Sequence, residues 1–578
     1  MKKGNIKRML NFLRPYKIQL IVAFASAILG VPLGIFAPIL IGRAVDAVIG
    51  TDRVDFADVG KNLVLLLICV AISSLLGWIL QILARKVSAN SAQDMRREAF
   101  GKINAASIHK IDAASHGDLI SRLVNDTDAV AEGLQQAITQ FIPGVVTIVA
   151  TLVVMCVINL PIALVVIVIT PLSIIFAQFV GKRTAKYFRE QAKTQGELSG
   201  FVGEIVGNQT LVQTMGHEKK AEEKFEVLAE NYFQANFQAT FYSSVGNPGT
   251  RFVNSVVYTA VAVFGCLYAL SGGITVGGIS AFLSYANQYT CPFNEITAVL
   301  TQIQSAIAGA QRLFEVIDWE AEAEDAENAI IKENSEGFIK AENLEFSYTE
   351  EKPFIRNFSF DAKPGERIAL VGPTGCGKTT LINLLMRFFP LNGGQIMIDG
   401  VDSRKIQKNA LRKQFGMVLQ ETWLKEATVH ENIAYARESA TREEVVSAAK
   451  TALADGFIKR LPRGYDTVIK SGGSNLSAGQ RQLLCIARIV LAEPDMYILD
   501  EATSSIDTRT EAAIQRAMEN LMQEHTSFVV AHRLSTIQDA SQILVLKDGR
   551  IEERGTHDAL IAKEGFYAKL FKSQFQES

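Results

Sequence analysis

The stretch Gly372-Pro-Thr-Gly-Cys-Gly-Lys-Thr-Thr380 decides the fold of the C-terminal half of this chain. It follows the apolar run Arg367-Ile-Ala-Leu-Val371, which predicts a buried strand, and it leads into a predicted helix from Leu381 to Arg387. Glycines let the backbone curl so that successive N–H groups and the helix N-terminus point at phosphate oxygens. The stretch therefore predicts a nucleotide-binding loop in an α/β domain.

The side chains of this loop have the chemistry that ATP and Mg²⁺ require. We expect Lys378 to reach the β- and γ-phosphates and the Thr379 hydroxyl to bind Mg²⁺. A lone match to such a loop has a real false-positive rate, but the preceding strand and the following helix make it specific. The residues expected to contact the nucleotide are Gly372, Thr374, Gly375, Cys376, Gly377, Lys378, Thr379 and Thr380.

A second apolar run, Met496-Tyr-Ile-Leu499, leads directly into two carboxylates, Asp500 and Glu501. Asp500 suits the Mg²⁺ shell, and Glu501 can polarise the attacking water as general base. Two adjacent acids at a strand end could instead be a structural cap. The phosphate loop makes that alternative the weaker one.

The run Leu476-Ser-Ala-Gly-Gln480 narrows this nucleotide-binding signal to one family. It resembles the LSGGQ signature of ATP-binding cassette (ABC) transporters. In that family's closed dimer, the signature of one chain completes the ATP site of the other, so Ser477, Gly479 and Gln480 are expected at a partner's nucleotide. The Ser477 hydroxyl and the following helix N-terminus offer donors to the γ-phosphate.

Further positions match the same family in order along the chain. Tyr348 resembles the aromatic residue that stacks on adenine, although alone it would be an ordinary strand aromatic. Gln420 resembles the Q-loop glutamine that contacts Mg²⁺ and the water, and residues 504–507 resemble the D-loop. His532 resembles the switch histidine at the γ-phosphate, although a lone histidine after a strand is usually structural. The resemblance thus makes Glu501, His532 and Gln420 the catalytic residues, and Thr379, Gln420 and Asp500 the Mg²⁺ ligands.

Two positions depart from the family pattern. Ala478 replaces the middle glycine of the signature, and Ser471 stands where exporters commonly have a glutamate. In heterodimeric bacterial exporters, one chain often keeps the catalytic glutamate and switch histidine but carries a drifted signature, and this chain is similar to that catalytically complete chain. The alternative is a homodimer in which Ala478 is a tolerated one-methyl change. The resemblance implies a dimer of half-transporters either way, and the departures favour a heterodimer.

The N-terminal half carries the apolar residues of a membrane protein. Of the 578 residues, 48% are hydrophobic, and they concentrate before about residue 300. A bilayer core of about 30 Å needs roughly 20 apolar residues in a helix. Six segments meet this length, and the last is the weakest match: 18–42, 62–84, 138–159, 161–181, 252–271 and 277–300.

The loops between these spans predict the orientation of the chain. The long loops 85–137 and 182–251 carry many Lys and Arg residues beside the spans, so both loops and both termini are expected in the cytoplasm. Helical arms of this length extend far beyond a bilayer. Their tips, near 107–114 and 209–216, correspond to the coupling helices of ABC exporters, which contact the ATPase domain. A solvated charged hairpin is the competing interpretation.

The fold class that follows is an α-helical membrane domain fused to an α/β ABC nucleotide-binding domain. The acidic stretch between Asp318 and Glu336 loses its apolar periodicity and predicts a linker. The expected domains are 1–318, a linker 319–336, and 337–578. The basic, amphipathic segment from Lys2 to Lys17 predicts a helix on the cytoplasmic membrane surface and not a cleavable signal.

Charge and cysteine content argue against several other classes of protein. The net charge of −2 gives no reason to expect nucleic acid as a partner. The six cysteines show no C-x-x-C spacing, so they suggest neither a zinc site nor a disulfide framework. The partners expected are the bilayer, a second half-transporter and an amphipathic substrate.

The sixth predicted span is unusually polar for a helix facing lipid. Polar groups at membrane depth are costly unless they face a cavity or a partner helix. We therefore expect this span to line the translocation path with Gln140, Gln178 and Asn254, and Glu295 to favour a cationic substrate. The competing interpretation is that these groups only hydrogen-bond helix to helix.

The resemblance implies an ATPase in the cytoplasmic membrane that exports an amphipathic compound, drug or lipid by alternating access. Importers usually carry the two kinds of domain on separate chains. A rival class is an ATP-gated or regulatory membrane protein that uses nucleotide binding alone. Such a gate does not require an intact general base at Glu501. A soluble ATPase with a misread hydrophobic half is a third possibility.

Overall fold

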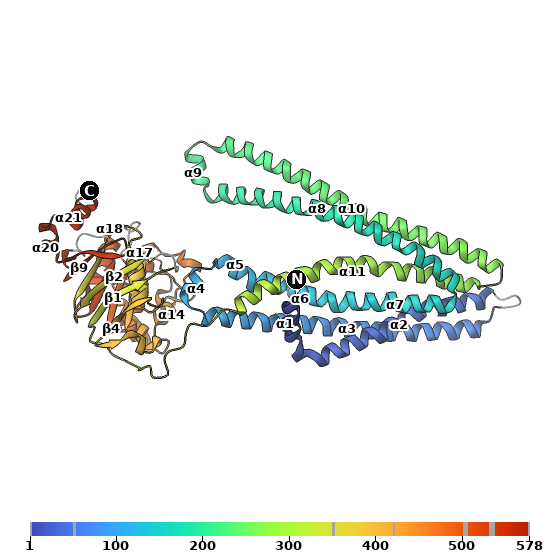
Figure 1. Ribbon diagram of the computed structural model, residues 1–578, viewed down its shortest axis with the longest axis horizontal. Coiled ribbons are helices and arrows are strands. Elements are labelled where there is room, and N and C mark those ends of the chain that lie inside the picture. Colours follow the sequence, from blue (N-terminus) through green and yellow to red (C-terminus); the bar gives the residue numbers. More distant parts are fainter. Residues whose placement is uncertain are drawn as a thin grey trace. The chain divides into compact units, whose positions relative to one another are not determined.

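The computed structural model describes residues 3–49, 54–348, 353–419, 422–500, 507–530 and 538–575 (Figure 1). The chain divides into two compact units, the first formed by Met1–Asn104 and Ala114–Trp319, and the second by Ala105–Ala113 and Glu320–Ser578. The short segment Ala105–Ala113 is thus surrounded in the sequence by the first unit but packs with the second.

The described residues of the first unit form helices joined by short connections. The turns η2 and η3 have π geometry and join their neighbours into one continuous helix, His116–Ile158. The elements are α1 (Lys3–Leu13), η1 (Arg14–Tyr16), α2 (Lys17–Ile49), α3 (Phe56–Ala105), α5 (His116–Ser121), η2 (Arg122–Asp126), α6 (Thr127–Gln136), η3 (Ala137–Phe141), α7 (Ile142–Ile158), α8 (Leu160–Gly207), α9 (Gln209–Thr214), α10 (Glu218–Leu270) and α11 (Val276–Ile317).

Helices cover the six predicted membrane spans, except for the last residues of two spans, Asn159 and Ser271. Three described helices are long and apolar enough to cross a bilayer: Lys7–Ile49, Phe56–Ala105 and His116–Ile158. Shorter apolar helices lie at Leu160–Pro171 and Asn254–Leu270. Among its described residues, α11 carries no such apolar stretch, in line with the polar side chains of the sixth predicted span.

Two of the long helices form a separate arm. In Figure 1, α8 and α10 run side by side and are joined at their tip by α9. Along the arm, the rings of Tyr187 and Tyr242 stack at 4.6 Å, and the Gln191 amide donates a hydrogen bond to Asn236 at 2.7 Å. The predicted arm tips are confirmed as short helices, because α9 spans Gln209–Thr214 and α4 spans Ile108–Asp112.

Helix α11 is the packing centre of the first unit. A Cβ added at Gly133 of α6 would lie 2.4 Å from the Cβ of Ala306, so α6 and α11 approach each other closely. The Tyr285 hydroxyl of α11 donates a hydrogen bond to the Ile35 carbonyl of α2 at 2.5 Å. Helix α1 packs against the other end of α11. The Arg8 guanidinium forms an ion pair with Asp318 and lies 4.4 Å from the centroid of the Phe314 ring.

The second unit is the predicted α/β domain and contains two sheets. One is antiparallel, in the order β2 (Ile355–Ala362), β1 (Ile339–Phe346), β4 (Gly393–Ile398), β5 (Val401–Asp402). The other is parallel except for its edge strand β10, in the order β10 (Arg550–Gly555), β9 (Gln542–Lys547), β3 (Arg367–Val371), β8 (Thr526–Val530), β7 (Met496–Asp500), β6 (Phe415–Val418). The predicted strands before the phosphate loop and before Asp500 are confirmed as β3 and β7.

The helices of this unit pack around three cores, one of which gathers α20 and α21 against β3 and β9. Of the other two, one lies between the sheets and α12, and the other gathers α14, α15, α17 and α18. The elements are α4, α12 (Lys378–Leu385), η4 (Ser403–Lys405), α13 (Lys408–Lys413), α14 (Val429–Ala434), α15 (Arg442–Thr451), α16 (Asp455–Ile458), η5 (Gly464–Asp466), η6 (Ser471–Gly473), α17 (Ala478–Ala492), α18 (Thr508–Met522), α20 (His557–Ala562) and α21 (Phe566–Phe575).

The helix after the phosphate loop differs from its predicted bounds. It begins at Lys378, three residues before the predicted Leu381, because Gly377 takes φ +112° and starts the helix as its cap. It ends at Leu385, before the predicted Arg387, which adopts a left-handed backbone with φ +50°. The loop therefore delivers Lys378 and Thr379 already within the first helical turn.

Candidate functional site

The phosphate loop has the backbone that its glycines predict. Gly375 and Gly377 adopt φ values of +81° and +112°, which residues with a side chain rarely reach. Inside the loop, the Lys378 ammonium donates hydrogen bonds to the carbonyls of Gly372 at 2.7 Å and Pro373 at 3.1 Å. The lysine charge is thus held where a phosphate bound by the loop amides would meet it.

The strand register brings Asp500 to the same end of the parallel sheet as this loop, where the carboxyl ends of the strands lie. Asp500 pairs with Val530 of β8, and Val530 pairs with Leu370 of β3, two residues before the loop begins. Two strand spacings of about 4.8 Å place the backbones roughly 10 Å apart. The Thr379 hydroxyl and the Asp500 carboxylate are oxygen ligands of the kind that Mg²⁺ prefers, so this donor set fits Mg²⁺ bound with nucleotide phosphates.

Tyr348 lies over the start of the loop helix. Its hydroxyl lies 2.7 Å from the Thr380 hydroxyl oxygen, and its ring contacts Phe346, Phe354 and Phe389 edge-on at 4.9 to 5.6 Å between centroids. The residue is 44% exposed, so part of it stays accessible. The contact with Thr380 ties the predicted adenine aromatic to the phosphate loop.

The signature run forms the N-terminus of α17. Ser477 is the helix cap: its Oγ accepts a hydrogen bond from the Gln480 amide at 3.3 Å, and the Gln480 side chain accepts one from the Ser477 amide at 3.0 Å. Ala478 is the first helical residue, where alanine is favoured over glycine by up to about 1 kcal/mol. The Ala478 departure is therefore compatible with the local fold.

Three predicted catalytic residues, Gln420, Glu501 and His532, lie outside the described residues, as do positions 504–506 of the D-loop. The last D-loop residue, Asp507, is described and caps α18 by accepting a hydrogen bond from the Thr510 amide at 2.8 Å. The roles of these residues stay predictions.

Comparisons with known proteins agree with this architecture. The profile of the "ABC transporter transmembrane region" family matches residues 20–293, and the profile of the "ABC transporter" family matches residues 355–504. The chain is 39% identical over its full length to an uncharacterized ABC transporter ATP-binding protein, YfiC, of Bacillus subtilis, and covers 95% of that protein.

The chain belongs to the ABC transporter family. It is also 36% identical to a fatty acid ABC transporter ATP-binding/permease protein of Mycobacterium bovis, with 99% of this chain and 96% of the relative covered. A solved structure of a bacterial Atm1-family ABC exporter with ATP bound matches with a TM-score of 0.76 at 26% identity, covering 97% of this chain and 98% of the other.

In this ABC transporter, α4 packs directly on the nucleotide-binding domain. The ring of His109 lies 5.1 Å from that of Phe389, and the Phe389 ring lies 5.6 Å from that of Tyr348. Aromatic contacts therefore connect α4 to Tyr348, and the Tyr348 hydroxyl continues the contact to Thr380. Sequence reasoning missed His109 and Phe389, because nothing in their local pattern indicates that residues 280 positions apart meet.

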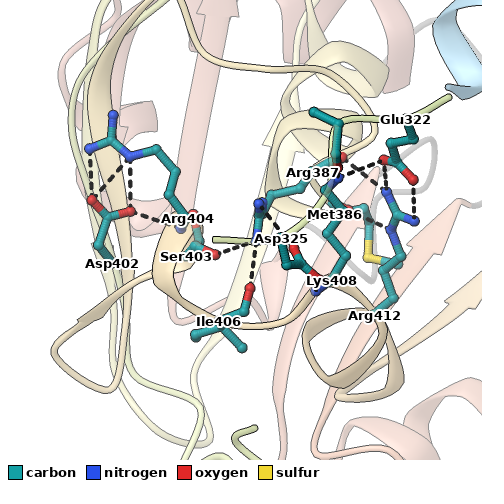
Figure 2. Close-up of polar contacts among 11 residues, drawn as sticks. Glu322, Asp325, Met386, Arg387, Asp402, Ser403, Arg404, Ile406, Lys408 and Arg412 are labelled. Atoms are coloured by element: carbon teal, nitrogen blue, oxygen red, sulfur yellow. Dashed lines mark hydrogen bonds and ion pairs between the residues drawn. The ribbon is translucent and has the colours of Figure 1, made fainter. Parts of the chain in front are cut away.

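The predicted linker lies against the nucleotide-binding domain as an irregular strap, which we define as residues 320–331. Its backbone pairs with the end of α3, since the Glu322 amide donates a hydrogen bond to the Ala105 carbonyl at 2.6 Å. Its carboxylates contact a basic cluster formed by Arg387, Lys408 and Arg412, next to the C-terminal end of α12 (Figure 2). Arg412 holds Glu322 at 2.6 Å and also donates to the carbonyls of Met386 and Arg387, just after α12.

A second carboxylate of the strap completes this attachment. The Lys408 amide donates a hydrogen bond to Asp325 at 3.0 Å, and Arg387 lies 3.6 Å from the same carboxylate. Arg387 also donates to the carbonyls of Ser403 and Ile406 at 2.8 and 2.6 Å (Figure 2). The strap thus ties the chain leaving the membrane domain to the C-terminal end of the phosphate-loop helix.

We expect Glu322→Gln to loosen the strap. A hydrogen bond to a charged group contributes about 1.5 to 3 kcal/mol. Because both side chains are partly exposed, we expect a loss of about 1 to 2 kcal/mol, which corresponds to roughly five- to thirtyfold more frequent opening. Limited chymotrypsin cleavage after Trp319 should accelerate by that factor. Glu324→Gln is the matched control, because Glu324 is an exposed strap carboxylate. Equal cleavage rates in both variants would contradict the role of Glu322.

The same contacts predict how the strap responds to pH. Burial raises the pKa of Glu322, but the hydrogen bond and charge of Arg412 and the charge of Lys408 outweigh it, so the pKa lies below its ordinary value near 4.5. A lowered carboxylate pKa stabilises the folded contact above that ordinary value, and the stabilisation is lost as pH falls through the folded pKa. Protection of the Glu322 amide from hydrogen exchange, corrected for the pH dependence of the intrinsic exchange rate, should therefore be unchanged from pH 8 to 5 and decline only below about pH 4.5.

Proposed function

We propose that this ABC transporter hydrolyses ATP at the interface between two nucleotide-binding domains and uses it to export an amphipathic small molecule, drug or lipid. The observation that carries the proposal is the single chain that joins membrane-length helices to a phosphate loop and a capped signature helix. The likeness to an exporter structure over 97% of the chain supports the direction of transport. The fatty acid transporter among its relatives supports a lipid-like substrate.

Mg²⁺ bound with ATP would supply charge neutralisation at the β- and γ-phosphates. Of this chain's residues, Thr379, Asp500 and Gln420 would hold the ion, and Lys378 would bind the phosphates. Ser477, Gly479 and Gln480 at the start of α17 would bind the γ-phosphate of the partner's ATP. Glu501 would orient and deprotonate the water, and His532 would contact the γ-phosphate.

The functional unit in this proposal is a dimer of half-transporters. The stacked rings of Phe233, Phe237 and Phe241 form an aromatic stripe along α10, and these residues are 57%, 57% and 53% exposed. Such a stripe on an arm that carries many charges needs a covering partner. A second half-transporter would cover it. Because Ala478 suits the first position of α17, a homodimer competes with the heterodimer that the sequence departures favour.

The orientation follows from the charges of the two long loops. We place both termini, the arm tips and the nucleotide-binding domain in the cytoplasm, and the spans in the cytoplasmic membrane. ATP binding would join the two nucleotide-binding domains, and hydrolysis would release them. A ligand that binds one of two conformations more tightly shifts the equilibrium between them, which is how ATP would drive alternating access.

Glu501→Gln tests this proposal against an ATP-gated channel. ATPase activity of the purified chain in nanodiscs, alone and with a candidate partner half-transporter, should fall by about 10² to 10⁴-fold in the variant, because general-base catalysis contributes that much. ATP binding should persist. A channel that needs only nucleotide binding would keep its function in Glu501→Gln.

The same measurement separates the two kinds of dimer. Activity of the chain alone that is lost in Glu501→Gln means a homodimer whose Ala478 signature works. Activity that appears only with the partner means a heterodimer in which this chain supplies Glu501. The absence of Glu501-dependent hydrolysis in both preparations would refute the proposed ATPase.

A further inference from the structure

A polar pocket of about 520 Å³ is lined by α10 and α11, at and directly beside the predicted spans 252–271 and 277–300. Positions 251, 254, 255 and 258 of α10 line it, and positions 280, 283, 284 and 287 of α11 face them. Both sets have the spacing of one helix face. Seven of these eight side chains carry a polar group and Leu283 is the exception. Polar side chains in membrane helices typically face the interior of the helix bundle or a water-filled cavity.

Of the described residues that line this pocket, Arg251 is the one that carries a charge. Among the described residues, no carboxylate lines the pocket or forms an ion pair with Arg251. Arg251 precedes the end of α10 at Leu270 by 19 residues. At about 1.5 Å per residue this is roughly 28 Å, close to the thickness of a bilayer core. Arg251 thus directly precedes the predicted span 252–271.

The neighbouring polar groups of the pocket also have unused hydrogen-bonding capacity. The Asn254 Oδ1 atom is buried and has no hydrogen-bond partner in the described part of the chain. The two ends of an amide are interchangeable by rotation, so Asn254 can donate to a ligand oxygen. Tyr258 and Ser280 add hydroxyl donors to the same pocket.

We infer that this pocket binds the anionic head group of an amphiphile, a carboxylate or a phosphate, at Arg251. A planar guanidinium binds either group through two parallel hydrogen bonds. The volume suits a head group with the first methylene groups of its tail. This inference rests on the proposed export function and names its substrate class. It is opposite in sign to the cationic preference expected from Glu295, which is exposed and does not line this pocket.

The test uses a photoreactive fatty acid carrying a diazirine, with the assembled transporter in nanodiscs of zwitterionic lipid. We expect labelled peptides to contain residues 251–258 or 280–287, and oleate to compete. Oleyl alcohol and oleylamine should not compete, because they lack the negative charge. Dodecyl phosphate beside oleate distinguishes a phosphate site from a carboxylate site. Competition by oleylamine equal to that by oleate would overturn the inference and favour the Glu295 hypothesis.

Variants of Arg251 make the test specific. Arg251→Gln should reduce labelling roughly tenfold or more, since an ion pair with hydrogen bonds contributes about 1.5 to 3 kcal/mol. Arg251→Lys keeps the charge and should retain most of the labelling. This variant controls for a loss of labelling that is caused by misfolding. Arg189→Gln on α8 removes an exposed charge outside the pocket and should change nothing. Unchanged labelling in Arg251→Gln would overturn the inference.

Failure of this inference is distinguishable from failure of the proposed function. If ATP hydrolysis depends on Glu501 but labelling does not depend on the charge of the competitor, the anion site is overturned and the proposed exporter function stands. Labelling that follows Arg251 without Glu501-dependent hydrolysis would support the site and refute the proposed pump.

Discussion

Replacement of Lys378 by alanine is expected to abolish ATP hydrolysis, with a loss of at least about 10² to 10³-fold. The Lys378 ammonium is held inside the phosphate loop by the carbonyls of Gly372 and Pro373. Its charge would meet the β- and γ-phosphates, where negative charge develops during transfer. Steady-state phosphate release from the purified transporter in nanodiscs measures this effect.

A matched lysine controls for the loss of a charge. Lys413 is exposed and lies in the last turn of α13, away from the loop, so Lys413→Ala should retain full hydrolysis. Binding of a fluorescent ATP analogue, measured beside hydrolysis, shows whether Lys378→Ala acts on binding or on the chemical step. Hydrolysis within threefold of the unchanged protein would exclude this loop as the catalytic site.

Arg312→Met is expected to destabilise the membrane domain by about 2 to 3 kcal/mol. Asp126 is only 3% exposed, and Arg312 binds it through two nitrogens, with Nε donating at 2.8 Å. Removing the arginine leaves a buried carboxylate without its cation. The full cost of such a break is about 3 to 5 kcal/mol, but the Arg312 side chain is 57% exposed, so water can replace part of the interaction.

The measurement is the thermal unfolding temperature of the purified protein in detergent. The double variant Arg312→Met with Asp126→Asn should recover most of the lost stability, because the neutral amide costs less to bury. Arg189→Met is the control, since Arg189 is exposed on α8. An unfolding temperature equal to that of the control would contradict a stabilising role for this ion pair.

The sequence predicted the local parts of the nucleotide site well. The loop at Gly372, the strand ending at Asp500 and the helix following Ser477 all appear where the pattern indicated. Each depends on residues adjacent in the chain: glycines that allow positive φ, a β-rich apolar run, and a serine that caps a helix. Local rules of this kind do not require knowledge of the tertiary fold.

The linker shows where local rules were insufficient. Its acidic composition indicated only a segment without periodic structure. The basic partners of Glu322 and Asp325 lie at positions 387, 408 and 412, and their convergence depends on the packing of α12 and α13. An acidic stretch that would be solvated alone is ordered by cations that the sheet and helices assemble.

The sequence by itself determined the family, the order of its membrane and ATPase parts and the local backbone of the phosphate loop and signature helix, and it predicted the membrane spans and the residues of the ATP site. Only the tertiary structure decided that His109 reaches Tyr348 through Phe389, that Glu322 joins Arg412, and that Arg251 shares a pocket with α11. The physical reason is the separation along the chain of the residues that interact. Backbone conformation and helix periodicity are set within a few residues, whereas contacts across hundreds of residues depend on how completed helices and sheets pack.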